Sequence, residues 1–198
     1  MTQLRVSLAL LVVAGCASAP EPTPSQELTP ARLFPLTAGS AWSYDVDTGD
    51  GNTALAITKV TEAGSATAAV QGGEGLTRYE LRPDGIFRTS LSGYLLKAPV
   101  RLGATWPSGG GMQAEITRLG LDLSTPAGNF RGCVEVNERG APSGALITTT
   151  YCPDVGPALV VSRMELLTGK VEVVARLRGY QIGPAAHPEP NSTLTPVK

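Results

Sequence analysis

This chain of 198 residues has few side chains that could act together in acid–base or nucleophilic catalysis. The one histidine, His187, lies in a proline-rich stretch near the carboxyl end, so the usual general base is missing from the part of the sequence that could fold. Ser-His-Asp and Cys-His catalytic sites are thereby excluded. Asp84, Asp122 and Asp154 stand in predicted turns, and no spacing brings two of these carboxylates together. We expect no catalytic residues and no enzymatic activity.

One acidic cluster has a spacing that suits a hard cation. Asp45, Asp47 and Asp50 lie in a glycine-rich run, and alternate oxygen ligands in such a loop can surround Ca²⁺. The run departs from an EF-hand loop, because Gly49 stands where the third ligand belongs and no glutamate occupies the twelfth position. A solvated hairpin turn is the alternative, and we expect it instead of a specific calcium site. Too few Cys and His remain for a zinc site, and no motif implies a cofactor.

The first cysteine, Cys16, follows a short segment with the character of an export signal. Arg5 precedes an apolar stretch, residues 8–13, that is too short to span a bilayer as a helix. Residues 13–16, Val-Ala-Gly-Cys, resemble the bacterial lipobox, in which small residues admit the signal peptidase and the cysteine thiol receives a diacylglycerol. The resemblance implies cleavage before Cys16 and attachment of the mature chain to a membrane through lipid. An ordinary signal peptide with a chance cysteine is the alternative.

The other two cysteines, Cys133 and Cys152, are predicted to form a disulfide, because an exported domain meets an oxidising compartment. Alternation places both thiols on the solvent face of two strands joined by a turn at residues 140–144. Pairing them would set Val134 opposite Tyr151, with apolar positions on one side of the hairpin. A redox-active pair is the alternative, but there is no Cys-x-x-Cys spacing.

The elements that must position these residues lie in one central stretch. We expect a signal peptide at 1–15, the lipidated cysteine and a proline-rich linker at 16–31, a β domain at 32–183 and a disordered tail at 184–198. Ala17 stands where an aspartate would signal retention in the inner membrane of enteric bacteria, so the lipobox resemblance implies delivery to the outer membrane. Charged residues make up 17% of the chain with a net charge of −1, so nucleic-acid binding is not expected.

An all-β fold is predicted for the domain. Trp42 and Tyr44 alternate with polar residues, as do Met112, Ala114 and Ile116 in a later segment. The chain has 23 Gly and 16 Pro, and no window of a dozen residues sustains a helical stripe without one of them. We expect about ten strands in an antiparallel curved sheet, a sandwich or a partial barrel.

The domain also contains a repeated pattern that indicates two tandem homologous halves, at about 34–98 and 99–182. Pro, three residues, Gly, two residues and Trp occur as Pro35, Gly39 and Trp42, and again as Pro99, Gly103 and Trp106. Further matches follow in the same order: 57–60 with 116–119, 61–64 with 125–128, and Tyr79 before Pro83 and Asp84 with Tyr151 before Pro153 and Asp154. Each turn is expected to place its Trp at the start of a strand, where the ring seals an end of the core. Chance similarity of two turn-rich stretches is the alternative.

A set of residues between 34 and 160 resembles a group of uncharacterised bacterial lipoproteins. The residues are Phe34, Pro35, Leu36, Gly39, Trp42 and Tyr44, then Gly128, Asn129, Phe130 and Cys133, then Tyr151, Pro153, Val155 and Gly156. Those proteins commonly continue with Gly-Leu-Val, whereas here Pro157 and Ala158 interrupt, so the next strand is expected to start later. The resemblance implies an exported, β-rich domain and no particular activity.

Two functions are consistent with these features. The first is a non-enzymatic envelope protein, anchored to a membrane by lipid, whose β surface binds a protein or glycan or has a structural role. The second is a carrier or sensor that shelters a lipid or other apolar ligand inside the curved sheet. An interior cavity would favour the carrier, and a solid core with an exposed aromatic patch would favour the surface binder.

Overall fold

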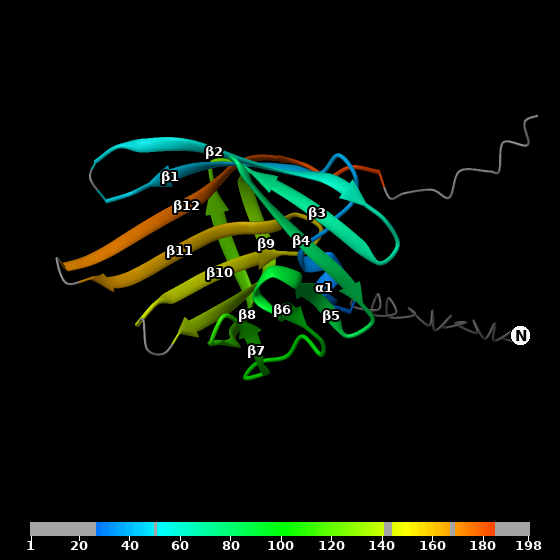
Figure 1. The fold of residues 1–198 in the computed structure, drawn as a ribbon. Helices are drawn as coiled ribbons and strands as arrows, with labels where there is room; N and C mark the ends of the chain where they lie inside the picture. Colours follow the sequence, from blue (N-terminus) through cyan, green and yellow to red (C-terminus); the bar gives the residue numbers. More distant parts are fainter. Residues whose placement is uncertain (1–26, 50, 141–143, 167–168, 185–198) are drawn as a thin grey trace, which may run out of the picture.

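Strands form almost all of the regular structure in the computed structural model, which describes residues 27–49, 51–140, 144–166 and 169–184 (Figure 1). A short helix, α1 (Pro30–Leu33), comes first, and one 3-10 turn, η1 (Thr89–Leu91), lies between two strands. The strands are β1 (Ala41–Asp47), β2 (Thr53–Ala63), β3 (Thr67–Gly72), β4 (Gly75–Arg82), β5 (Gly85–Arg88), β6 (Gly93–Lys97), β7 (Thr105–Gly109), β8 (Met112–Thr125), β9 (Gly128–Gly140), β10 (Leu146–Cys152), β11 (Gly156–Leu166) and β12 (Gly169–Gln181). The predicted all-β class is confirmed.

All twelve strands belong to one antiparallel sheet. Its order is β6-β5-β4-β3-β2-β1-β12-β11-β10-β9-β8-β7, so a first run (β1–β6) and a second run (β7–β12) are joined by the β1–β12 ladder. The sheet curls until its two end strands, β6 and β7, touch along a line that we call the seam. There the Trp106 indole Nε1 donates to the Tyr94 carbonyl oxygen at 3.0 Å, and the Gly110 amide donates to the Leu91 carbonyl at 3.1 Å. The predicted curved sheet is therefore a nearly closed barrel.

The strand count exceeds the expected ten because β5, β6 and β7 have only four or five residues each, too few to show alternation in the sequence. Pro157 does not delay the following strand, since β11 begins at Gly156 beside a register shift in β10, a position that tolerates proline. The segments matched in the sequence fall on the first, second and fourth strands of each run, on the turns before the first strands and on the turns after the second and fourth strands. The homology of the two halves stays a prediction.

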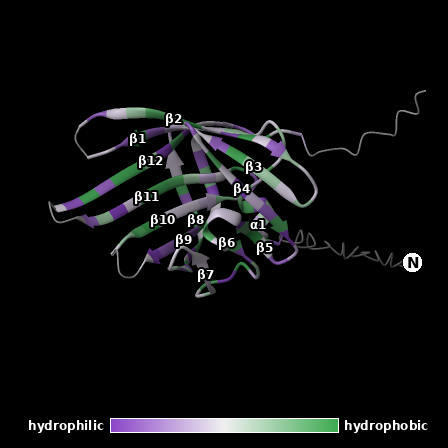
Figure 2. Ribbon diagram, viewed as in Figure 1, coloured by the Kyte–Doolittle hydropathy of each residue, from purple (hydrophilic) through white to green (hydrophobic). Residues whose placement is uncertain are grey.

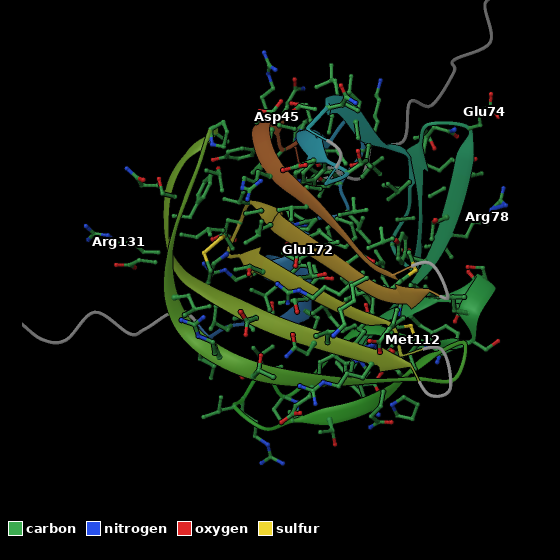
Figure 3. All side chains as sticks on the ribbon, turned by 90° about the vertical axis from the view of Figure 1, so that its left-hand side faces the viewer. Asp45, Glu74, Arg78, Met112, Arg131 and Glu172 are labelled. Carbon is green, nitrogen blue, oxygen red and sulfur yellow. A yellow bond between two sulfur atoms is a disulfide. The ribbon has the colours of Figure 1, made fainter. Side chains whose placement is uncertain are left out.

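Period-two alternation sets which side chains enter the barrel. In β1, Trp42 and Tyr44 are buried while Ser43 and Asp45 lie on the outer side, and in β8, Ala114 and Ile116 are buried. Figure 2 shows hydrophobic and hydrophilic residues interleaved along the strands. Glu74, Arg78 and Arg131 project from the outside of the barrel (Figure 3). The lumen is consequently the apolar side of the sheet.

Helix α1 and the residues after it pack into the barrel core. Thr29 is the N-cap, accepting a hydrogen bond from the Arg32 amide, and Pro30 follows at the first helical position. Leu33 is fully buried and Phe34 nearly so, among the core residues of the sheet. None of the helices in the described ranges is long and apolar enough to cross a membrane. The role of α1 is to fill the barrel.

The β8–β9 hairpin bends over one end of the barrel. Gly120 and Gly132 adopt φ of +70° and +71°, a conformation open to glycine, and the Ala127 amide at the tip donates to the Leu177 carbonyl of β12 at 3.1 Å. Cys133 and Cys152 form the predicted disulfide, with Val134 opposite Tyr151 as expected. The expectation that both sulfurs face solvent is wrong, because both cysteines are buried. The alternation breaks at Gly132, and Leu121, opposite Cys133, packs against the core there.

The two predicted turn tryptophans occupy equivalent places in the two runs. Trp42 and Trp106 are each the second residue of a strand and are almost fully buried. Gly39 and Gly103 precede them with φ of +82° and +74°, which explains glycine at both turns. The Trp42 indole donates to the Val155 carbonyl, whereas the Trp106 indole donates across the seam.

Candidate binding cavity in the barrel lumen

A cavity of about 310 Å³ lies in the lumen between the first run and strands β11 and β12. Its wall takes residues from six strands and from the segment after α1: Phe34, Tyr44, Thr58, Val70, Gly72, Gly75, Thr77, Tyr79, Pro157, Val160 and Ala175. None of these residues is charged. The cavity is therefore suited to an uncharged, largely apolar group.

Strand register brings these wall residues together from distant parts of the sequence. Thr58 is opposite Gly72, Val70 is opposite Thr77, and Val160 is opposite Ala175, so both members of each cross-strand pair line the cavity. The small residues Gly72 and Gly75 at the β3–β4 turn leave space that larger side chains would fill. The cavity thus results from register and from the size of a few side chains.

Two phenols, those of Tyr44 and Tyr79, contribute polar groups to the wall. The Tyr44 hydroxyl donates to the Pro157 carbonyl at 2.9 Å, which fastens β1 to the start of β11. Burial raises the pKa of both Tyr44 and Tyr79 above the ordinary value of a phenol. Both hydroxyls therefore stay protonated at neutral pH, and with Thr58 and Thr77 they form a neutral polar set. Such groups can orient a hydroxyl or ester of a ligand, but they include no general base.

An aromatic cluster closes one end of the cavity. The Phe34 ring centroid lies 5.3 Å from that of Trp42, 5.9 Å from that of Tyr79 and 6.4 Å from that of Tyr151. Gly156 lies directly under the Trp42 indole, where any β-carbon would come within 2.8 Å of Nε1. Of these rings, Phe34 and Tyr79 line the cavity, and Trp42 and Tyr151 pack against Phe34.

The inner face remains apolar beyond the cavity, toward the β11–β12 turn. Val173 and Val171 follow Ala175 on the same face of β12, and Val160 is followed by Ser162 and Met164 on β11. These positions are only partly buried, and Met164 is 40% exposed. Apolar surface therefore extends from the cavity along the hairpin.

A second cavity, of about 280 Å³, lies between α1 and the β4–β5 hairpin. It is lined by Thr29, Pro30, Ala31, Phe34, Pro35, Leu36, Thr37, Leu81, Arg82, Pro83, Gly85 and Ile86. The Arg82 guanidinium is occupied by Glu80 at 2.7 Å and stacks 3.6 Å over the Phe87 ring. This second cavity is also mainly apolar.

A buried ion pair beside the seam was not predicted from the sequence. Arg88 pairs with Glu138 and donates to the Ser108 carbonyl at 2.8 Å, so it joins β5 to β7 and β9. The Arg88 Nε and the Ser108 hydroxyl have no hydrogen-bond partner among the described residues. Glu138 follows Val134 and Val136 at every second position of β9, so its side chain points inward with theirs. A charged residue at such a position was the sequence feature that could have revealed the pair. The pair lines neither cavity and serves to hold the barrel closed.

The residues of the weak calcium candidate do not converge in the described part of the chain. Asp45 pairs with Arg178 at 3.1 Å, and the Asp47 carboxylate accepts the Gly49 amide at 2.9 Å. Asp50 lies outside the described residues, as do Cys16 and His187. Within the described ranges, no group of three or more His, Cys, Asp and Glu residues could hold a metal ion.

Comparisons with known proteins identify no family. No protein-family model and no curated protein matches the chain. Among solved structures, a candidate exported protein with a YmcC-like fold from Bacteroides fragilis aligns with a TM-score of 0.42 and 13% identity, covering 75% of this chain and 98% of the other. A candidate lipoprotein from Parabacteroides distasonis aligns with a TM-score of 0.38, 13% identity and the same coverage. Likeness at this level shows neither a family nor a function for this chain.

Proposed function

We propose that this chain is a membrane-anchored, non-enzymatic envelope lipoprotein whose barrel binds a small, uncharged and largely apolar ligand. The observation that carries the proposal is the 310 Å³ cavity, whose wall has no charged side chain. Its volume is near the lower end for small-molecule sites, which run from about 300 to 1,000 Å³. The ligand is therefore a small molecule or one chain of a larger lipid.

The chemistry of the wall supports binding better than reaction. Burial of apolar ligand surface contributes about 25 cal/mol per Å², and the hydroxyls of Tyr44, Tyr79, Thr58 and Thr77 can satisfy one polar group of the ligand. Neither a base nor a nucleophile with a depressed pKa is among the residues of the wall. A carrier or sensor is the role that this wall supports best.

The anchor rests on the sequence. The lipobox-like residues 13–16 and the proline-rich residues 17–30 support a lipid on Cys16 and a spacer between membrane and barrel, with the outer membrane as the destination. Mass spectrometry of the protein from native membranes should find an amino terminus at Cys16 carrying acyl chains. An unmodified or uncleaved amino terminus would contradict this part of the proposal.

Ligand binding can be tested with an uncharged fluorescent probe, N-phenyl-1-naphthylamine, and the Cys16→Ala chain made as residues 16–198, which carries neither the apolar export segment nor lipid. We expect saturable binding with one probe per protein. Thr77→Trp, which fills the cavity, should weaken binding at least tenfold. Arg78→Trp is the matched control, because Arg78 is the next residue on β4 and points outward (Figure 3). Equal binding by both variants, or no saturable binding, would refute the cavity as the site.

A second candidate, a protein or glycan partner on the barrel surface, is favoured by one observation. Leu55 and Ile57 are 60% and 57% exposed on the outer face of β2. Cross-linking the lipidated protein in intact envelopes should then yield an adduct that Leu55→Glu with Ile57→Glu abolishes. An adduct that persists in this double variant would exclude these residues as the contact.

A further inference from the structure

Phe34 occupies a special place between the two cavities. Among the residues that line them, Phe34 alone lines both. The inner face of β4 shows how the cavities are arranged, since Thr77 and Tyr79 line the first and Leu81, the next inward position, lines the second. Alternate residues of a strand are about 7 Å apart, so the second cavity directly follows the first along the barrel wall.

The ring of Phe34 lies where the first cavity ends and the second begins. It packs against Tyr79 at 5.9 Å, edge to face, and Tyr79 is the last residue of β4 on the first cavity. The backbone beside it is anchored, because the Phe34 amide donates to the Pro30 carbonyl and the Asp154 amide donates to the Arg32 carbonyl at 2.7 Å. The side chain, only 6% exposed, is therefore a fixed partition.

We propose that Phe34 sets the length of the ligand that the lumen accepts, and that the ligand is a single alkyl chain with an uncharged polar end. This inference rests on the proposed function. Because the two small cavities lie in line and share Phe34, an unbranched chain in the first cavity would run toward the second if the Phe34 ring were absent. The neutral hydroxyls of the first cavity suit an alcohol or ester, and the Phe34 ring stops the chain where the second cavity begins.

The test uses n-alkanols of increasing length, from octanol to octadecanol, which displace N-phenyl-1-naphthylamine from the Cys16→Ala chain. Each added methylene should tighten binding about fourfold until the chain reaches Phe34, after which affinity levels off. In Phe34→Ala the plateau should begin several carbons later. Phe34→Leu, which keeps an apolar side chain in the core, should give an intermediate shift and decides the matter if Phe34→Ala does not fold.

Phe130→Ala is the control, because it also removes an aromatic ring but lines neither cavity and contacts Tyr180. Its plateau should coincide with that of the parent chain. If the parent binds neither the probe nor any alkanol, the proposed function and this inference both fail. If it binds the probe but no alkanol displaces it, only this inference fails. If the parent shows a plateau that neither Phe34 variant moves, or that Phe130→Ala moves equally, the role of Phe34 is refuted while the binding function stands.

Discussion

The two junctions between the first and second runs close the same barrel by different means. Strands β1 and β12 pair along the whole of β1. Trp42 also donates to the Val155 carbonyl in the nearby β10–β11 turn, and Tyr44 donates to the Pro157 carbonyl at the start of β11. At the seam, β6 and β7 are the two ends of the sheet and share no ladder. There Gly93 of β6 lies directly against the backbone of Gly109 in β7, a contact that we call the glycine crossing. This crossing, the Trp106 indole and the Arg88–Glu138 pair hold the two strands together in place of a ladder.

This difference indicates where the barrel opens first. A ladder distributes its stability over many backbone hydrogen bonds, whereas the seam depends on a few contacts whose loss is not compensated by neighbours. The same Gly-x-x-Trp pattern thus occurs at both junctions. Trp42 adds a hydrogen bond beside a continuous ladder, whereas Trp106 supplies one where the ladder is missing. Four predictions test this contrast.

The largest effect is expected at the glycine crossing of the seam. A β-carbon on Gly93 would lie 2.1 Å from the Gly109 backbone nitrogen, so Gly93→Ala forces β6 and β7 apart. We expect a loss of about 3 kcal/mol or more in the free energy of unfolding, measured by urea denaturation. Gly64→Ala is the control, since its nearest neighbour would be an ordinary contact at 3.8 Å. Equal stability of the two variants would show that the crossing is not tight.

The disulfide lies near the other junction, because the Val155 amide beside Trp42 donates to the Cys152 carbonyl at 3.1 Å. Replacing both Cys133 and Cys152 by Ala should lower the free energy of unfolding by about 3 kcal/mol, as the chain-entropy model gives for a loop of this length. Hydrogen exchange should accelerate at residues 152–157 and stay unchanged at β6 and β7. Detection of two free thiols in the native protein would contradict the pairing.

The tryptophans test the contrast directly. Trp106→Phe and Trp42→Phe each remove one indole donor, to the partly buried Tyr94 carbonyl and to the buried Val155 carbonyl respectively, and each loss is expected to cost about 1–3 kcal/mol. Hydrogen exchange should separate them, because Trp106→Phe exposes the amides of β6 and β7 while Trp42→Phe leaves the β1–β12 ladder protected. Equal acceleration of exchange at the β6 and β7 amides in both variants would contradict a difference between the two junctions.

The smallest effect is expected from the exposed pair between Arg32 and Asp154, which ties α1 to the β10–β11 turn. The hydrogen bond from Arg32 lowers the pKa of the Asp154 carboxyl. Its contribution is therefore complete above the unfolded pKa of about 3.9 and disappears as pH falls through the lower, folded value. Asp154→Asn should lose less than about 1 kcal/mol at pH 7, because Asp154 is 62% exposed. Urea titrations at pH 7 and below pH 3 should show this difference vanish in acid; a constant difference would exclude the ion pair.

Local pattern was sufficient for several features of this protein. Alternation predicted the inward Trp42 and Tyr44, and the register of Val134 against Tyr151 followed from keeping apolar residues on one face. The burial of Cys133 was missed, because the bend at Gly132 interrupts the alternation on which that expectation depended. Short strands such as β5 were missed because four residues carry too little periodic signal.

The class of the fold, the paired cysteines and the two glycine–tryptophan turns could be predicted from the sequence, because each depends on neighbouring residues and on the two-residue period of a strand. The seam, the Arg88–Glu138 pair and the wall of the cavity could not. Those features require knowing which strands are neighbours and how far the sheet curls. Residues as distant as Phe34, Thr77 and Val160 become one surface only when the barrel closes around α1.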